Sequence, residues 1–326
     1  MDKNILLTGG LGFIGSHLLD RLLEQGHHIT VVDDLRSNAV DPSDYAEFIQ
    51  RFQMRFLQID AAHLNPDLLP RSIDEIYHLA SPVGPVGVLI HAGNIVRQVV
   101  DITYAVMQLA KHYKAKLVDV STSEVYGGGQ QGLCAEDMPR IIQAETTVRL
   151  EYAVAKLAME TALINQTKTS PLQAVIVRPF NVAGPRQQAA GGFVIPRFVG
   201  QALRGGPLTV YGDGQQIRAF THVADIVDGL LLAMERGQSG EVYNLGNPDN
   251  TTRILWLADI VRMAVAQVPI EYIDPKVLHG ALFAEAANKF PSADKAMREL
   301  GWRPMHGLER IVDDVHQYLR GNPVNL

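Results

Sequence analysis

Short apolar stretches and amphipathic stretches alternate through the first half of the chain. Runs rich in Val, Ile and Leu predict buried strands at Asn4–Thr8, Ile29–Asp33, Met54–Ile59, Ile73–Leu79, Leu117–Ser121 and Ala174–Arg178. Apolar residues at helical spacing predict helices at Phe13–Gln25, Val96–Tyr113 and Thr147–Asn165. Such alternation, with β-branched strands, is typical of a doubly wound parallel sheet. We therefore expect an α/β fold of the Rossmann type over residues 1–180, which would bind the cofactor.

The pattern changes after about residue 180, where glycine and proline become frequent. We predict helices at Val194–Arg204, Val223–Glu235 and Ile254–Gln267, and strands at Leu208–Tyr211 and Val242–Leu245. These shorter elements indicate a smaller C-terminal α/β lobe over residues 181–326, packed on the sheet. Two-lobed α/β enzymes generally bind ligand in the cleft between their lobes, so we expect the substrate in that cleft.

Composition narrows the class of protein. The chain has 326 residues, of which 47% are hydrophobic and 20% charged, and its formal net charge is −6. No cluster of Lys and Arg supports binding to nucleic acid or to a membrane surface. The single cysteine, Cys134, excludes an internal disulfide and a cysteine-based metal site. No apolar run approaches the ~20 residues that span a bilayer, and no signal-peptide pattern precedes the first strand. We expect a cytoplasmic enzyme or binding protein that holds no metal.

A glycine pattern follows the first predicted strand and opens the first predicted helix. Its glycines are Gly9, Gly12 and Gly15. A tight turn there lets the backbone approach a pyrophosphate, and the free N–H groups at the start of the helix attract the phosphates. A purely structural glycine turn is the alternative, but the strand–loop–helix context favours a dinucleotide site.

Acidic residues at the strand ends bear on which dinucleotide binds. Asp33 closes the second strand and Asp34 follows it. A carboxylate there accepts hydrogen bonds from the adenosine ribose and repels a 2′-phosphate. Arg36 would suit a phosphate, but two carboxylates stand before it, so we predict NAD rather than NADP. Asp60, after the third strand, fits an acceptor for the adenine amino group and a turn residue equally well.

Tyr152 and Lys156 lie four residues apart in a predicted helix, which places both side chains on one face. The ammonium and the positive nicotinamide ring favour the phenolate and lower the tyrosine pKa. The tyrosine can then take a proton from a substrate hydroxyl. Such a pair alone is common on helix surfaces. The pair gains significance from Ser121–Gly127, a hydroxyl-rich segment at the strand end where such sheets bind ligands. A polar turn would show the same residues in this segment.

These motifs together resemble the extended short-chain dehydrogenase/reductase family over nearly the whole chain. They are the glycine pattern, Ser121–Gly127, Tyr152 with Lys156, and Arg178–Arg186. Four further segments resemble the nucleotide-sugar branch, namely Leu208–Gly214, Arg218–Val223, Tyr243–Gly246 and Lys295–Trp302. The resemblance implies a bound NAD that oxidises a sugar at C4 and a nucleotide-diphosphate sugar, most simply a UDP-sugar, as the substrate.

The resemblance also implies a role for each matching residue. Thr122 would be the hydroxyl partner of Tyr152, Asn181 and Arg218 would hold the diphosphate, and Tyr211 and Glu285 would contact the nucleotide. The other candidates for the sugar are Pro82, Glu124, Arg149 and Arg186. The candidates for the cofactor are Gly9, Gly12, Phe13, Ile14, Gly15, Asp33, Asp34, Asp60, Ala61, Leu79, Ala80, Ser81, Ser121, Tyr152, Lys156 and Pro179.

The triplet Thr122-Ser123-Glu124 bears on which reaction follows the C4 ketone. A 4,6-dehydratase resembles Thr-Asp-Glu here, and a serine cannot replace the acid, so we rank dehydration third. A 4-epimerase needs only Thr122, Tyr152 and Lys156. A UDP-glucuronate decarboxylase resembles Thr-Ser-Glu, and its His-Leu-Ala-Ser-Pro matches residues 78–82. Once C4 is a ketone, the C6 carboxylate belongs to a β-keto acid and can leave as CO2. We rank decarboxylation slightly ahead of 4-epimerisation.

Several segments depart from both groups. Decarboxylases usually carry an arginine where Lys289 precedes Phe-Pro-Ser, and Arg and Lys differ at bidentate sites. The Arg-x-Gly-Asp of many epimerases appears as Leu-Phe-Ala-Glu at residues 282–285. Arg149 fits either a contact with a sugar carboxylate or a solvated helix residue. We interpret His78 as structural.

Two inferences concern the protein as a whole. A dinucleotide sensor without chemistry is the alternative to an enzyme, but sensors in this superfamily typically lose the tyrosine or the lysine, and this chain keeps both. The helices at 96–113 and 147–165 are apolar around their circumference, through Val99, Val100, Val106, Met107, Leu157, Ala158 and Leu163. In relatives the corresponding pair forms a dimer interface, so we expect a homodimer.

Overall fold

The computed structural model describes residues 2–127, 132–142, 144–286 and 288–322. Its strands are β1 (Asn4–Thr8), β2 (His28–Asp33), β3 (Met54–Gln58), β4 (Glu75–His78), β5 (Lys116–Val120), β6 (Leu133–Cys134), β7 (Gln173–Pro179), β8 (Val182–Ala183), β9 (Leu208–Tyr211), β10 (Ile217–Ala219), β11 (Thr221–His222), β12 (Val242–Leu245), β13 (Thr251–Arg253), β14 (Ile270–Ile273) and β15 (Phe290–Pro291). Its α-helices are α1 (Phe13–Glu24), α2 (Ala46–Gln50), α3 (Ile95–Tyr113), α4 (Val148–Thr169), α5 (Val194–Leu203), α6 (Val223–Arg236), α7 (Ile254–Ala264), α8 (Pro275–His279), α9 (Asp294–Leu300) and α10 (Leu308–Gly321).

Seven parallel strands form the central sheet, in the order β12-β7-β5-β4-β1-β2-β3. The chain runs outward from β1 through β2 to β3, and then returns to the other side of β1 with β4 and continues to β5. This reversal is the switch point at which doubly wound sheets bind ligands, beyond the carboxyl ends of the strands. The predicted Rossmann-type fold is confirmed.

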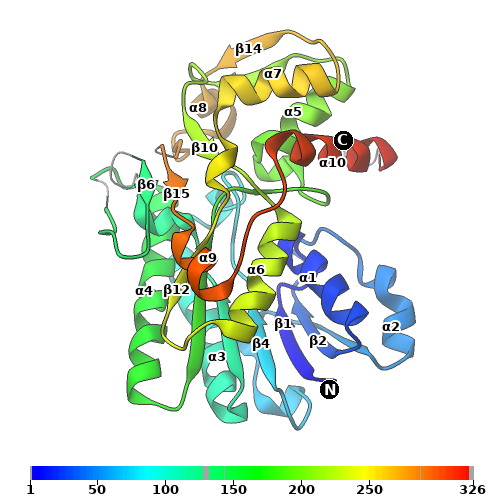
Figure 1. Cartoon of the computed structure of the whole chain (residues 1–326), viewed down its shortest axis with the longest axis vertical. Helices are drawn as coiled ribbons and strands as arrows, with labels where there is room; N and C mark the ends of the chain where they lie inside the picture. The colour runs from blue at the N-terminus through cyan, green and yellow to red at the C-terminus, as the bar shows by residue number, and fades with distance from the viewer. Residues whose placement is uncertain (1, 128–131, 143, 287, 323–326) are drawn as a thin grey trace.

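Helices cover both faces of the sheet (Figure 1). Successive strand residues point to opposite faces, so one strand contributes to two cores. Leu7 of β1 belongs to the cluster that contains Leu18 of α1. Leu6, its neighbour, belongs to the cluster that contains Val106 of α3 and Leu163 of α4. The sheet is therefore buried on both sides, which explains why its strands show no polar face in the sequence.

One strand expected in the smaller lobe lies elsewhere. β12 pairs with β7 and extends the central sheet, and α6 packs on β5 and β7. These two elements come from the C-terminal half of the chain, but their apolar residues complete the first half's core, as Leu245 and Leu230 do. A run of four buried residues does not show which sheet it will join. The division of the chain at residue 180 stays a prediction.

The smaller lobe surrounds a third core. Helices α5, α7 and α10 pack on one another beside the parallel pair β9 and β14, which the upper part of Figure 1 shows. Phe198, Leu257 and Ile311 are fully buried in this core.

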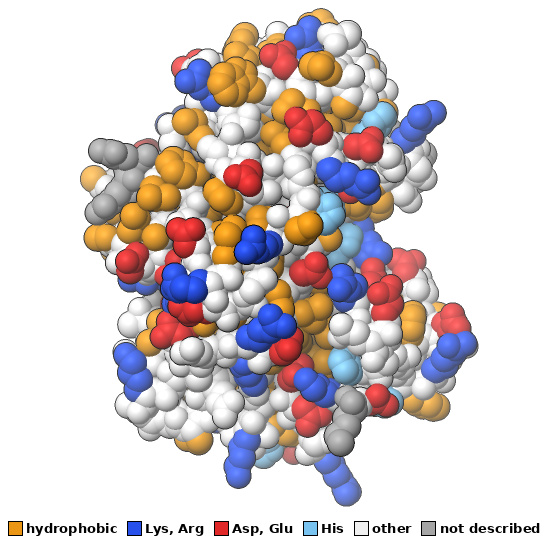
Figure 2. Space-filling model, viewed as in Figure 1, with side chains coloured by type: hydrophobic (Ala, Val, Ile, Leu, Met, Phe, Trp, Pro, Cys, Tyr) orange, Lys and Arg blue, Asp and Glu red, His pale blue; other side chains and the backbone are white. Residues whose placement is uncertain are grey.

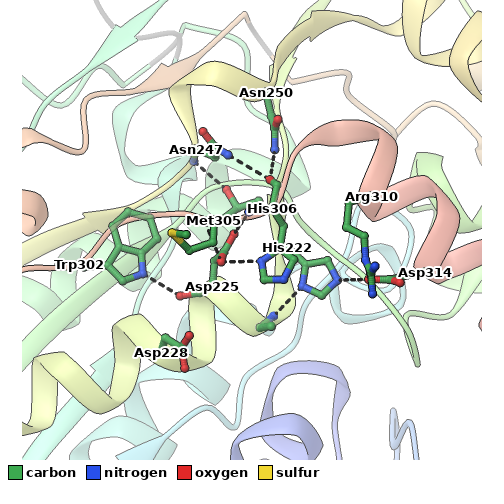
Figure 3. Close-up of polar contacts among 12 residues, drawn as sticks. His222, Asp225, Asp228, Asn247, Asn250, Trp302, Met305, His306, Arg310 and Asp314 are labelled. Atoms are coloured by element: carbon green, nitrogen blue, oxygen red, sulfur yellow. Dashed lines mark hydrogen bonds and ion pairs between the residues drawn. The ribbon is translucent and has the colours of Figure 1, made fainter.

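A polar network joins α10 and its preceding loop to α6 (Figure 3). The Asp225 carboxylate, 1% exposed, accepts hydrogen bonds from the N–H groups of Met305 and His306 and from His306 Nδ1, at 3.0, 3.2 and 2.7 Å. Its backbone carbonyl accepts from Trp302 Nε1 at 2.8 Å. The His306 ring stacks on His222, with centroids 4.4 Å apart. The lobe is thereby fixed to α6, the helix that follows β11.

The surface carries charges of both signs. Figure 2 shows acidic and basic side chains interspersed over the face that it presents. Among the described residues, no helix is long and apolar enough to cross a membrane.

Candidate active site

One cavity of about 1030 Å³ lies beyond the carboxyl ends of the strands, between the sheet and the smaller lobe. Every candidate cofactor, substrate and catalytic residue named from the sequence lines it. A single drug-sized ligand occupies a pocket of ~300–1,000 Å³, so this cavity has room for a larger ligand or for two ligands. The structure brings the candidates together, and their individual roles stay predictions.

The glycine loop forms the cavity wall at the start of α1. Gly9 has a φ of +70°, and a Cβ there would lie 2.7 Å from the Ala80 nitrogen. A Cβ on Gly15 would lie 2.0 Å from the Gly9 carbonyl oxygen. Gly12 precedes α1 and offers no side-chain cap to its first N–H groups. The backbone at this helix end is accessible to a pyrophosphate, as a dinucleotide requires.

The acidic residues at the strand ends also fit a dinucleotide without a 2′-phosphate. Asp33 accepts hydrogen bonds from the N–H groups of Leu11 and Leu35, each at 3.0 Å, and burial raises its pKa. Arg36, the cation that would suit a 2′-phosphate, is bound 3.2 Å from both Asp34 and Asp60. Because two carboxylates hold this guanidinium, the geometry favours NAD over NADP. Asp60 also accepts a hydrogen bond from the Ala62 N–H in the following turn, so it serves as a turn residue.

The catalytic candidates lie where β5 ends and α4 passes over it. Tyr152 and Lys156 are 9% and 3% exposed. Lys156 Nζ donates to the Val120 carbonyl at 2.9 Å. Thr122 caps the short 3-10 helix at Ser123–Tyr126 by accepting from the Glu124 N–H at 3.1 Å. This cap turns the chain directly after the strand and places the triplet at residues 122–124 against Tyr152.

With protein groups alone around it, the pKa of Tyr152 lies above its ordinary value. Burial is the main cause, and the Glu124 carboxylate opposes a phenolate as well. The hydroxyls of Thr122 and Ser81 act in the other direction but do not outweigh burial. The expected lowering of the tyrosine pKa included the positive nicotinamide ring, so it stays a prediction for the NAD-bound protein.

Ser121, a cofactor candidate that lines the cavity, also has a partner within the protein. Its hydroxyl donates to Glu160 of α4. Arg178 of β7 binds both oxygens of the same carboxylate, with Nε–Oε1 at 2.9 Å and Nη2–Oε2 at 2.5 Å. This buried ion pair fixes α4 to the sheet beneath the catalytic residues. His78 is structural as interpreted: it is 1% exposed, and burial lowers its pKa to about 3.

Glu124 is held between two cations. Its Oε1 lies 3.0 Å from Arg149 Nη1 and 2.5 Å from Lys289 Nζ. Arg149 Nε also donates to the Ala284 carbonyl at 3.1 Å, so this side chain is not a solvated helix residue. Burial alone would raise the pKa of Glu124, but the two cations hold it well below the ordinary value. The carboxylate is therefore ionised, and one net positive charge remains around it.

The far end of the cavity carries the nucleotide candidates. Arg218, 5% exposed, donates to Glu285 Oε1 at 2.6 Å and to the Ala286 carbonyl at 2.7 Å. The two residues expected to touch diphosphate and ribose therefore pair with each other. Tyr211 donates to or accepts from His279 Nε2 at 2.8 Å, and the Arg197 guanidinium lies 3.8 Å from the Tyr211 ring centroid. A flat base would find aromatic and cationic partners here.

Two further sugar-side candidates bind protein groups. Arg186 Nη1 pairs with Asp20 of α1 at 2.7 Å. Asn181 Nδ2 donates to the Ala219 carbonyl at 3.1 Å.

Sequence reasoning left out two site residues. Lys289 was noted only as a departure from an arginine, and its contact with Glu124 spans 165 positions of the chain. Arg197 lines the cavity, and its Nε and Nη1 find no hydrogen-bond partner within the described part of the chain. Nothing in its helical pattern marked it.

Comparisons with known proteins agree with this geometry. The family model for the NAD dependent epimerase/dehydratase family matches residues 5–246. The chain belongs to this family. A UDP-N-acetyl-alpha-D-glucosaminuronate decarboxylase from Bacillus cytotoxicus is 33% identical over 329 residues, which cover 98% of each chain. UDP-glucuronic acid decarboxylase 4 from Arabidopsis thaliana is 35% identical and covers 98% of this chain and 70% of the relative.

Solved structures extend the comparison. A UDP-glucuronic acid 4-epimerase from Bacillus cereus, in complex with UDP-glucuronic acid and NAD, has a TM-score of 0.83 at 26% identity. It covers 98% of this chain, and this chain covers 99% of it. A dTDP-glucose 4,6-dehydratase from Bacillus anthracis, with NAD, gives the same TM-score and identity, with 99% and 98% covered. This family member is an enzyme, and its cofactor is NAD.

Proposed function

We propose that the protein decarboxylates a UDP-linked uronic acid, with UDP-glucuronate as the simplest substrate and a UDP-pentose as the product. The observation that supports this reaction is the contact of the Glu124 carboxylate with both Arg149 and Lys289. A net positive charge beside Tyr152 attracts the C6 carboxylate of a uronic acid, whereas a neutral hexose offers it no partner. The decarboxylases at 33% and 35% identity support the same substrate class.

The residues present suit each proton movement of this reaction. NAD supplies reversible hydride transfer at C4 when it is bound. Tyr152 accepts the C4 hydroxyl proton, and Thr122 orients that hydroxyl. With C4 a ketone, the C5–C6 bond breaks, its electrons form the C4–C5 enolate and CO2 leaves. C5 then takes a proton, and Tyr152 returns its own proton to O4. Ionised Glu124 cannot be the proton donor at neutral pH, so its place is electrostatic.

A 4-epimerase acting on the same uronate is the second candidate. It is supported by the solved 4-epimerase that carries UDP-glucuronic acid at a TM-score of 0.83. Dehydration lacks support, because Ser123 is 3% exposed and provides no carboxylic acid at the triplet's middle position. Decarboxylation and 4-epimerisation of the uronate are distinguished by their products.

The deciding experiment incubates the protein with NAD in D2O and follows UDP-glucuronate and UDP-N-acetylglucosaminuronate separately. Mass spectrometry and proton NMR identify the products. We expect loss of CO2 and one deuterium at C5 of the product, because C5 is protonated from solvent after the C5–C6 bond breaks. An unchanged mass with an inverted C4 hydroxyl would assign the 4-epimerase, and no change in either substrate would reject a uronate reaction.

A pair of variants ties the reaction to the cavity. Tyr152→Phe removes the proton acceptor, so turnover should disappear while NAD still binds. Tyr272→Phe makes the same change at a 56%-exposed tyrosine of β14 and should leave turnover intact. Wild-type turnover in Tyr152→Phe would contradict the assignment of the catalytic tyrosine.

We further propose a homodimer through α3 and α4. The supporting surface differs from the residues first named, because Val99, Val106, Met107 and Leu163 are buried within the monomer. Val96, Tyr104 and Val154 remain exposed at 43%, 55% and 37%. Sedimentation at several concentrations should give twice the chain mass, and Val154→Glu should give the monomer.

A cytoplasmic location of the protein also stays a prediction.

A further inference from the structure

A row of polar side chains crosses the floor beneath the cavity. Thr8 of β1 is in register with His78 of β4, which is in register with Asp119 of β5. All three are at most 2% exposed. Thr8 Oγ1 lies 2.7 Å from His78 Nδ1, and His78 Nε2 lies 3.3 Å from Thr103 Oγ1 on α3. Two hydroxyls thus satisfy the buried imidazole, which stays neutral.

Asp119 stands at the end of this row, and the surroundings of one of its carboxylate oxygens need an explanation. Its Oδ1 is buried and finds no hydrogen-bond partner among the residues that the structure describes, and His78 Nε2 is 3.9 Å away. A buried carboxylate is costly unless an opposite charge compensates it. Asp119 shares a strand face with Leu117, which packs in the α3–α4 core. Lys156 of α4 meets the sheet on that face, and the charges of Asp119 and Lys156 attract each other.

The other charges around Lys156 already have partners. Arg178 binds both oxygens of Glu160, one helical turn beyond Lys156 on α4. Lys156 Nζ itself has a neutral acceptor, the Val120 carbonyl. His78 and Tyr152 are neutral. Among the described groups beneath the cavity, Asp119 is therefore the carboxylate that remains to balance the positive charge of Lys156.

We propose that Asp119 is a positioning residue that supplies the counter-charge keeping Lys156 protonated in this buried site. It acts through Lys156 and does not touch the substrate. The consequence for turnover rests on the proposed function, because Tyr152 accepts the substrate proton there and the nearby Lys156 ammonium favours its phenolate. The charge coupling itself can be measured without any substrate.

The first test uses the pH dependence of stability. Asp119→Asn keeps the side-chain shape and removes the charge, so folded Lys156 loses its proton at a lower pH. The unfolded lysine keeps its pKa of ~10.4. At pH values between the pKa of folded Lys156 and that of the unfolded lysine, the unfolded chain binds more protons than the folded chain. The free energy of unfolding therefore rises with pH in this range. We expect the unfolding free energy to rise more steeply between about pH 8 and pH 10 in Asp119→Asn than in the wild type.

Matched variants isolate the coupling. Thr103→Val replaces the uncharged hydroxyl that contacts His78 by a methyl group of the same shape, so its slope should equal that of the wild type. In a Lys156→Met background, Asp119→Asn should add no slope, because the group that titrates is gone. Equal slopes for Asp119→Asn and the wild type would overturn the inference.

The second test follows turnover. The alkaline limb of the kcat profile should move down by about one pH unit in Asp119→Asn. A uniform loss of kcat at every pH would indicate a merely structural side chain and would overturn the inference. If the stability slope changes but no uronate is turned over, the proposed reaction fails and the Asp119–Lys156 coupling stands.

Discussion

Lys289 Nζ lies 2.5 Å from Glu124 Oε1, with the lysine fully buried between β15 and the end of β5. The pair joins the segment before α9 to the triplet at residues 122–124, which follows β5. An ammonium makes a compact point contact, whereas a guanidinium needs room for a planar fork. Lys289 therefore holds Glu124 through a single point contact rather than a bidentate one.

Replacing Lys289 should therefore affect uronates more than nucleotides. Lys289→Met leaves Glu124 with Arg149 alone, and we expect kcat/KM for UDP-glucuronate to fall about 100-fold, within the cost of removing one partner of a buried charge pair. The affinity for UDP alone should change little, as isothermal titration would show.

Two variants serve as references for Lys289→Met. Lys289→Arg keeps the charge and should lose less activity, about tenfold, because the larger group must displace its neighbours. Lys295→Met removes a lysine that pairs with Glu241 outside the cavity and should leave kcat/KM unchanged. An equal loss for UDP and UDP-glucuronate would contradict a carboxylate-specific role.

The phenol of Tyr152 should resist ionisation until its cofactor binds. Burial raises its pKa above the ordinary value, so the protein without NAD should show no Tyr152 step below about pH 10 in the tyrosinate absorbance. Subtracting the titration of Tyr152→Phe isolates this residue. Adding NAD places a positive ring beside the phenol and should move the step to lower pH. A step near neutral pH without NAD would contradict the effect of burial.

The local patterns of the chain predicted the sheet well, because its strands and helices are defined by short-range periodicity. Asn4–Thr8 and Leu208–Tyr211 have the expected bounds. The membership of β12 in the central sheet was not predictable, because Val242–Leu245 would be equally apolar in either lobe. The sequence of a four-residue strand does not show with which distant strand it will pair.

The candidate site shows the same limit. Motif residues such as Tyr152 and Thr122 were predictable because their spacing reflects a local requirement. The partners that set their charges come from elsewhere: Lys289 reaches Glu124 from 165 positions away, and Asp119 meets Lys156 only through sheet packing. The burial that raises the pKa of Tyr152 likewise cannot be seen in a four-residue spacing.

Cofactor choice should depend on the carboxylates that hold Arg36. Asp34→Ser removes one of its two partners, so the guanidinium can turn toward a 2′-phosphate. We expect the Kd for NADP to improve about tenfold and the Kd for NAD to weaken. Glu47→Ser makes the same charge change at a 66%-exposed side chain away from the cavity and controls for net charge. An unchanged preference in Asp34→Ser would show that Arg36 does not read the ribose.

The junction between α6 and α10 should be the most sensitive polar point outside the cavity. Asp225 is buried and accepts three hydrogen bonds from Met305 and His306. Asp225→Asn replaces one acceptor oxygen by an amide that faces other donors, which should lower the unfolding free energy by about 3 kcal/mol. Asp228→Asn, three residues along the same helix, alters a pair with Arg21 that is about half exposed and should cost less than about 1 kcal/mol. Denaturant melts of both variants measure the difference. Equal destabilisation would mean that the network in Figure 3 contributes no more than a surface ion pair.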